Sequence, residues 1–247
     1  SYGDIRRGSS GGAALMQRLQ YDSRRERSLP ETQSPNAFEA YDGTAKLMFR
    51  PAPAQTLTAL YQIGRQPSVP RYDVFEVQRF DAWRYDPQER DLGYLQFQTT
   101  QPTPLYNAMT ATVSVNRQFE RRIKQRAGRD SEEHQEFGAT TTGLQLQLNR
   151  FLGDNHYLVY GLEYYHDDVS AATTETDLKT GTTVPVTPLY PDGSKYNSFG
   201  AFVEGPFTLS PLWNINAGLR YSAVDLTAIF DPGSTSSFSF GALEQSP

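Results

Sequence analysis

The sequence predicts an all-β protein, an antiparallel meander that forms part of a large transmembrane β-barrel. Apolar and polar residues alternate with a period of two in many segments, and short connections alternate with long ones between those segments. No apolar run approaches the ~18 residues of a membrane-spanning helix. The composition of 15 Tyr and 14 Phe against 3 Met also suits strands better than helices.

The alternation is clearest in about nine segments, each of a length usual for a strand. In chain order, the predicted strands are 13–21, 44–50, 56–63, 94–99, 109–116, 143–149, 158–166, 198–204 and 213–221.

The connections between these strands differ strictly in length. Four are short and rich in Pro, Gly or Asp, as tight hairpins are, whereas the stretches between them are long, charged and polar. In a meander, this order puts every short turn on one rim and every long loop on the other, which is typical of an outer-membrane barrel. The short connections are 50–55, 100–106, 150–156 and 205–212, and the long ones are 22–43, 64–93, 117–142 and 167–197.

The alternating strands predict one face towards lipid and one towards a wet lumen, as in the run LQLQLN at 144–149. The predicted lipid-facing residues are Leu144, Leu146, Leu148, Leu158, Leu162, Ile215 and Leu219. The predicted lumen-facing residues are Arg18, Lys46, Gln145, Gln147, Glu163, Glu204 and Arg220.

Aromatic residues gather near both rims, where a bilayer has its interfaces. A soluble sandwich or lipocalin-like barrel is the alternative, because its half-buried strands also alternate, but it has no reason to keep all long loops on one rim. The predicted aromatic girdles include Tyr61, Tyr106, Tyr157, Tyr164, Trp213 and Tyr221.

Residues 223–247 are interpreted as the start of an extracellular loop, which makes the number of strands odd. The two terminal strands then have no certain partner, and each unsatisfied backbone group in hydrocarbon costs several kcal/mol. We therefore expect the chain 1–247 to be one piece of a larger barrel.

Three stretches resemble the barrel of TonB-dependent outer-membrane receptors: 41–73, 144–168 and 190–222, the last containing GAFVE, LSPLW and NAGLRYS. The resemblance implies a barrel of about 22 strands filled by a plug, of which this chain holds about nine strands. Residues 1–12 would lead into the barrel from the missing plug. It also implies a place in the outer membrane of a Gram-negative bacterium, with lipid and lipopolysaccharide around the barrel.

The implied function is import of a scarce, large nutrient such as an iron–siderophore complex or haem, driven through the receptor's own plug and TonB. No bond is made or broken, so neither an enzyme nor a cofactor is expected. A passive porin-like channel shares every strand argument and stays open as an alternative. Nucleic acid is a poor candidate for a partner, because 28 acidic side chains outnumber 23 basic ones.

Chemistry has few places in this sequence, which contains three His and no Cys. The cluster His166, Asp167 and Asp168 raises the further alternative of a barrel-embedded hydrolase. We expect neither a catalytic nor a metal site, because His134 and His156 lack believable partners and strand parity puts His166 at headgroup level, just outside the bilayer.

Arginine is abundant in the predicted long loops, and its planar guanidinium suits phosphate and carboxylate. Three roles remain open for these arginines: pairing with loop carboxylates, contact with lipopolysaccharide phosphates, and capture of an anionic ligand. The candidate ligand residues are Arg71, Arg79, Arg84, Arg121 and Arg122.

Overall fold

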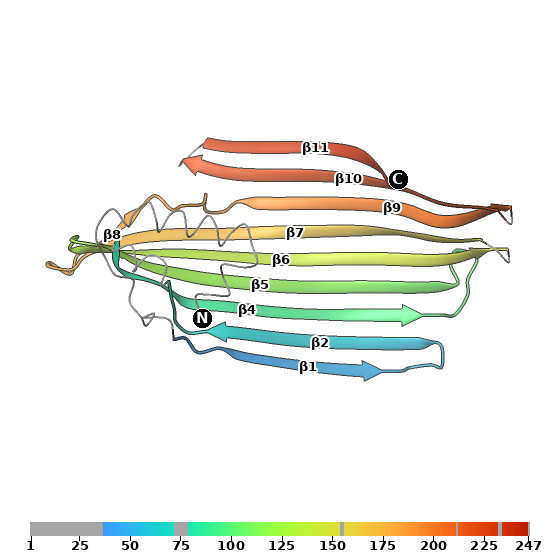
Figure 1. Cartoon of the computed structure of the whole chain (residues 1–247), viewed down its shortest axis with the longest axis horizontal. Helices are drawn as coiled ribbons and strands as arrows, with labels where there is room; N and C mark the ends of the chain where they lie inside the picture. The colour runs from blue at the N-terminus through green and yellow to red at the C-terminus, as the bar shows by residue number, and fades with distance from the viewer. Residues whose placement is uncertain (1–36, 72–78, 154–155, 211, 232–233, 247) are drawn as a thin grey trace.

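The structure is a computed structural model that describes residues 37–71, 79–153, 156–210, 212–231 and 234–246. These residues form one 11-stranded sheet (Figure 1). Every pairing between strands in it is antiparallel. The described residues contain no helix long and apolar enough to cross a membrane.

Nine strands lie side by side in chain order, which confirms the predicted meander. They are β1 (Tyr41–Phe49), β2 (Gln55–Gln66), β4 (Phe80–Thr99), β5 (Ala108–Arg126), β6 (Ser131–Leu152), β7 (His156–Asp177), β9 (Lys195–Ser210), β10 (Trp213–Asp231) and β11 (Ser234–Ser246). Two short strands lie off this path: β3 (Val69–Pro70) pairs with β4, and β8 (Thr183–Val186) pairs with β7.

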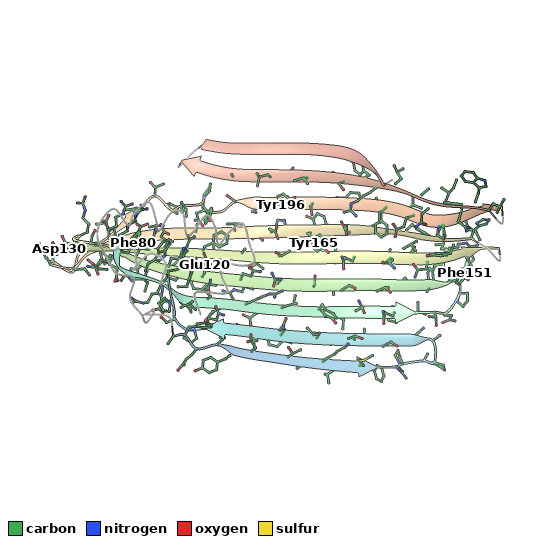
Figure 2. All side chains as sticks on the ribbon, in the orientation of Figure 1. Phe80, Glu120, Asp130, Phe151, Tyr165 and Tyr196 are labelled. Carbon is green, nitrogen blue, oxygen red and sulfur yellow. The ribbon has the colours of Figure 1, made fainter. Side chains whose placement is uncertain are left out.

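The connections separate to the two ends of the sheet as predicted. The four predicted short turns all lie at one end, on the right in Figure 1, and the other connections lie at the opposite end. Along β6 and its turns, Asp130 and Phe151 mark these two ends (Figure 2).

The strands are much longer than predicted, with 22 residues each in β6 and β7. The predicted long loop 117–142 is instead a hairpin of β5 and β6, with its turn at 127–130. Gly128 in that turn has φ 72°, and its amide donates to Asp81 Oδ2 at 3.1 Å. We call residues 80–91, 117–141 and 167–177 the hairpin extension. Charged and polar residues lie on both of its faces, so it lacks the alternation that reveals a strand in the sequence.

The end of the chain corrects a second expectation. Residues 223–231 continue β10, and β11 follows at Ser234–Ser246 where a loop was expected. Backbone register pairs Val224 with Phe240 and Leu226 with Phe238. The predicted strand 13–21 lies outside the described residues. Within them, the sheet is open, with β1 and β11 at its edges.

The register gives the sheet two faces of different chemistry. Leu144 is paired with Val113 and Tyr164, whereas its neighbour Gln145 is paired with Thr112 and Glu163. We call the first the apolar face and the second the polar face, because side chains alternate between faces along each strand. Leu144 is 49% exposed, and among the described residues no second layer is packed over the apolar face at this point.

Candidate functional site

The seven predicted lipid-facing residues all lie on the apolar face. Leu146 is paired with Leu162, and Leu148 connects through Tyr160 and Val203 to Leu219. Leu158 and Ile215 alternate in phase with these residues. The band from Trp213 to Tyr221 has nine residues, which at ~3.3 Å per residue and a ~40° tilt is about 23 Å tall. That height is close to the ~25 Å apolar band of outer-membrane barrels.

The predicted lumen-facing residues within the described ranges all lie on the polar face, and Arg18 lies outside those ranges. Gln145 is paired with Glu163, and Arg220 is paired with Phe202, which faces Gly161. Lys46, Gln147 and Glu204 share this face by register.

An ion pair joins Arg220 to Glu163 across an intervening strand. Gly200 lies between them on β9, and a Cβ there would lie 2.6 Å from Arg220 Nη2 and 2.8 Å from Glu163 Oε1. The missing side chain therefore lets the two charged groups meet flat against the sheet. The nearby Gln145 amide donates to the Tyr165 hydroxyl at 2.6 Å, so this part of the polar face is a hydrogen-bonded wall.

The predicted aromatic girdles are only partly on one face. Tyr61, Tyr164, Trp213 and Tyr221 follow the alternation of the apolar face. Tyr157 is on the opposite face, because it alternates in phase with Glu163 and is paired with Phe151. Its closeness to a turn suggested an interfacial position, but strand parity places it on the polar face. Tyr106 lies in the connection before β5.

The five candidate ligand arginines do not form one cluster. Arg84 is paired with Ile123 on the apolar face, and Arg121 shares that face, whereas Arg122 is paired with Tyr85 on the polar face. The Arg71 guanidinium lies 4.4 Å from the Trp83 ring centre, and Trp83 is paired with Lys124 on the polar face. Arg79 is exposed just before β4. Adjacent arginines therefore serve opposite faces of the extension.

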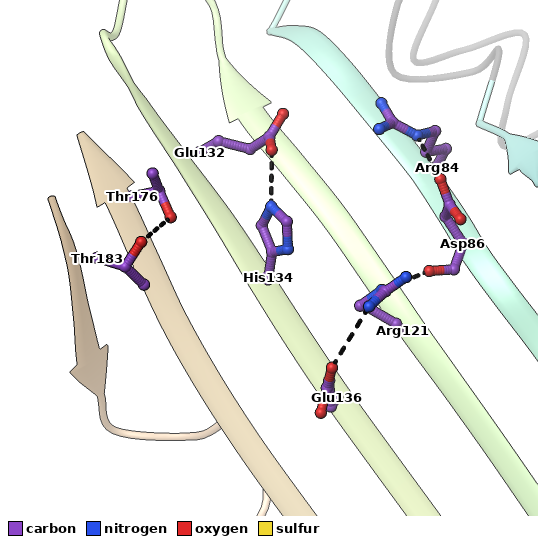
Figure 3. A network of polar contacts seen from close by, with 8 residues as sticks. All are labelled: Arg84, Asp86, Arg121, Glu132, His134, Glu136, Thr176 and Thr183. Atoms are coloured by element: carbon purple, nitrogen blue, oxygen red, sulfur yellow. Dashed lines mark hydrogen bonds and ion pairs between the residues drawn. The ribbon is translucent and has the colours of Figure 1, made fainter. Parts of the chain in front are cut away.

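The apolar-face arginines belong to a local polar network (Figure 3). Arg84 Nε lies 3.0 Å from Asp86 Oδ2, and Arg121 Nε donates to the Asp86 carbonyl oxygen at 2.6 Å. Arg121 also lies 3.7 Å from Glu136, and His134 Nε2 lies 2.7 Å from Glu132. Carboxylates thus neutralise these cations locally, which was the first of the three predicted roles.

The His166 cluster divides between the two faces. His166 Nε2 lies 3.1 Å from Asp168 Oδ2, and its Nδ1 lies 2.7 Å from Asn197 Oδ1. Asp167 points to the opposite face, because side chains alternate along β7. The three residues therefore do not converge on one reacting group. No cluster of metal-ligating side chains is present in the part of the chain that the structure describes.

An aromatic cluster that the sequence pattern does not indicate lies on the polar face of the extension. The Tyr190 and Phe137 rings lie 5.0 Å apart, and the Arg122 guanidinium lies 6.0 Å from the Tyr190 ring centre. Next to it, burial lowers the pKa of Lys124, and Glu133 at 3.5 Å partly opposes that shift. Tyr190 precedes β9 by several residues, so only the folded chain brings it to β5 and β6.

Solved structures share this fold. The copper transporter OprC superposes with a TM-score of 0.67 at 13% identity, over 83% of this chain and 33% of that one. Unliganded ferric citrate transporter FecA gives 0.63 at 15% identity, over 85% and 33%. The alcaligin receptor FauA from Bordetella pertussis gives 0.54 at 11% identity, over 83% and 31%. The chain thus spans about a third of the length of these structures.

No curated protein matches the sequence. The family model described as TonB dependent receptor-like, beta-barrel, matches residues 17–243, which is nearly the whole chain. That match agrees with the antiparallel meander, the two chemically distinct faces and the separation of short and long connections. The chain therefore belongs to the family of TonB-dependent receptor β-barrels.

Proposed function

We propose that this chain is part of the barrel wall of a receptor in the outer membrane of a Gram-negative bacterium. The receptor imports a scarce, large nutrient such as an iron–siderophore complex or haem. The observation that carries the proposal is the division of one continuous sheet into an apolar face and a polar face, within a family of such receptors.

On this proposal, the apolar band contacts lipid acyl chains, and Tyr61, Tyr164 and Tyr221 lie at the interface towards the long connections. The charged apolar face beyond them is then at the level of the lipopolysaccharide. Arg117 and Lys195 lie in that zone, at the two ends of one cross-strand row. Arg117 is paired with Thr140, Thr140 with Asp168, and Asp168 with Lys195.

The polar face then lines the lumen and meets the plug. Charges there are surrounded by water or by plug groups, so the Glu163–Arg220 pair is tolerated at a depth where a lipid-facing charge is costly. TonB would act through the plug, as the family implies, and supplies the energy that a passive pore lacks.

The cargo is proposed from the relatives together with the size of the barrel. Two of the similar structures are named for metal or metal-chelate transport, copper in OprC and ferric citrate in FecA. Large, scarce metal complexes are the cargo that requires high-affinity capture and an energised gate in place of diffusion.

An uptake assay on the intact receptor tests this proposal. Cells carrying the full-length receptor as their sole candidate route are given iron-55 as siderophore complexes, or iron-55 haem, with and without TonB. Accumulation that saturates and stops when TonB is deleted, or when the proton gradient is collapsed, supports import. Uptake that rises linearly with concentration and ignores both treatments would establish the porin-like channel instead.

A further inference from the structure

A cavity of about 450 Å³ lies against the polar-face residues of the hairpin extension. It is bounded by β2, β4 and β5, with Phe137 of β6 and Tyr190 closing one side. One cross-strand row of the polar face runs through Gly64, Arg90, Gln118 and Ala139. The residues at its two ends, Gly64 and Ala139, are small, which leaves the cavity open. The volume falls within the range of ordinary ligand sites, about 300 to 1,000 Å³.

The charges around the cavity do not favour an anion. On the polar face, its lining includes one cationic residue, Arg90, and two anionic ones, Asp42 and Glu120. Arg65 and Glu89 also border the cavity, but they alternate onto the apolar face, where Arg65 binds Asp91 with two hydrogen bonds, of 2.7 and 2.9 Å. An anionic ligand would therefore meet more negative than positive charge, although arginine-rich sequence suggested anion capture.

Amides supply most of the neutral polar groups of the cavity. Gln66 is directly paired with Gln88, and Gln118 lies in the adjacent cross-strand row. The side chains of Gln66 and Gln118 make no hydrogen bond to other described residues, so their donors and acceptors are available to a ligand. Each amide offers both a donor and an acceptor, which matches hydroxyl and amide groups.

Aromatic rings provide the apolar part of the site. Tyr190 and Phe137 are in contact at an interplanar angle of 58°, and both line the cavity. One row further along the polar face, Gln135 is paired with Thr173, and both side chains are more than nine-tenths buried. Gln135 Oε1 and Thr173 Oγ1 have no hydrogen-bond partner among the described residues. Neither residue lines the cavity, but buried polar atoms in native proteins normally have a partner, so the row next to the cavity has unused hydrogen-bonding capacity.

We propose that this cavity is a binding site for the uncharged, hydroxyl- and amide-bearing surface of an organic ligand. Gln66 and Gln118 exchange hydrogen bonds with it, and Tyr190 packs on its apolar side. This inference rests on the proposed import function and adds the chemistry of the cargo. Two sources share that chemistry: a neutral ferric trihydroxamate chelate and a neutral oligosaccharide.

The test measures binding to the intact, purified receptor by titration calorimetry, with three probes. Ferrichrome is a neutral ferric trihydroxamate, maltotriose is a neutral oligosaccharide, and ferric citrate is anionic. We expect one neutral probe to bind, and Gln118→Leu and Tyr190→Ala each to weaken it by about tenfold or more, because each removes a direct contact.

Gln125→Leu is the matched control, because Gln125 lies on the same strand but on the apolar face, paired with Glu132. It should leave the affinity within about twofold, as a remote surface change does. Binding of ferric citrate alone, binding of none of the three probes, or equal effects of Gln118→Leu and Gln125→Leu would each overturn the site. TonB dependence of uptake is read separately, so a failed cavity and a failed import function are distinguishable.

Discussion

The bilayer-level part of the sheet and the hairpin extension share one continuous ladder of backbone hydrogen bonds but differ in what surrounds them. At bilayer level, Leu144 on one face is next to Gln145 on the other. In the extension, Arg121 and Arg122 occupy opposite faces, and both are within ion-pair distance of a glutamate. Period-two alternation therefore reports two different environments on the faces of a strand, and not strand formation itself.

The largest effect on folding is expected from a charge placed at bilayer level. Leu146→Arg puts a cation on the apolar face near the middle of the band, which should cost about 2 to 4 kcal/mol and impair membrane assembly. Gln145→Arg places the same side chain on the polar face and should assemble normally. Heat-modifiable gel migration of the full-length receptor in outer membranes measures the folded fraction. Equal losses for the two variants would refute the assignment of faces.

Close packing at bilayer level gives the next largest effect. A Cβ at Gly161 would collide with the backbone carbonyl oxygen of Leu146 and lie 2.8 Å from the Phe202 ring. Gly161→Ala should therefore lower the free energy of unfolding by about 1 to 3 kcal/mol, as overpacking does.

Gly93→Ala is its control at the border of the extension, because a Cβ there meets nothing closer than 3.9 Å. Urea unfolding in lipid vesicles, followed by tryptophan fluorescence, should show a lower midpoint for Gly161→Ala only. A similar shift for both variants would mean that strand glycines matter for backbone freedom and not for space.

The meander and its faces were predictable because lipid and water impose different residues on the two sides of each strand. The predicted core 143–149 is the centre of β6, yet β6 reaches back to Ser131. Nothing in SEEHQEFG distinguishes its two faces, since both are polar, so the added length was invisible to a periodicity argument.

The candidate site was less predictable, because it depends on which residues become cross-strand neighbours. Gln66 and Gln88 are far apart in the sequence, and only the register of β2 and β4 pairs them. The arginines were visible as a group, but the bulge between Tyr85 and Gln88 helps decide which face each one takes. The connection between β7 and β9, which contains the short strand β8, brings Tyr190 into contact with Phe137. Amino-acid composition does not indicate this contact.

A smaller effect is expected where the two regions meet. Asp91 accepts hydrogen bonds from Arg65 and from the Tyr61 hydroxyl, the latter at 2.8 Å. Both members of the Arg65–Asp91 pair are about 30% exposed, so water screens it. Asp91→Ala should cost about 0.5 to 1 kcal/mol. A double-mutant cycle with Arg65→Ala measures the coupling free energy of the pair. A coupling free energy larger than the loss of unfolding free energy in Gly161→Ala would place the strongest contacts in the extension.

The smallest effects are expected at the tip of the extension. Lys179 and Asp130 form an ion pair at 2.5 Å, but their side chains are 72% and 60% exposed. Lys179→Ala should leave the unfolding midpoint unchanged within error, because such exposed pairs contribute little. Asp177 differs, since its carboxylate accepts the backbone amides of Lys179 at 2.8 Å and Thr180 at 2.9 Å.

These amides, first that of Thr180 and then that of Lys179, lower the pKa of Asp177 below its ordinary value. Because the folded pKa is the lower one, the stabilisation of this turn is complete above the ordinary aspartate pKa. It is lost as the pH falls through the folded value. Amide hydrogen exchange at Lys179 and Thr180, corrected for the intrinsic rate, should therefore lose protection in acid and in Asp177→Ala at neutral pH. Unchanged protection in both cases would mean that strand pairing, and not this carboxylate, holds the turn.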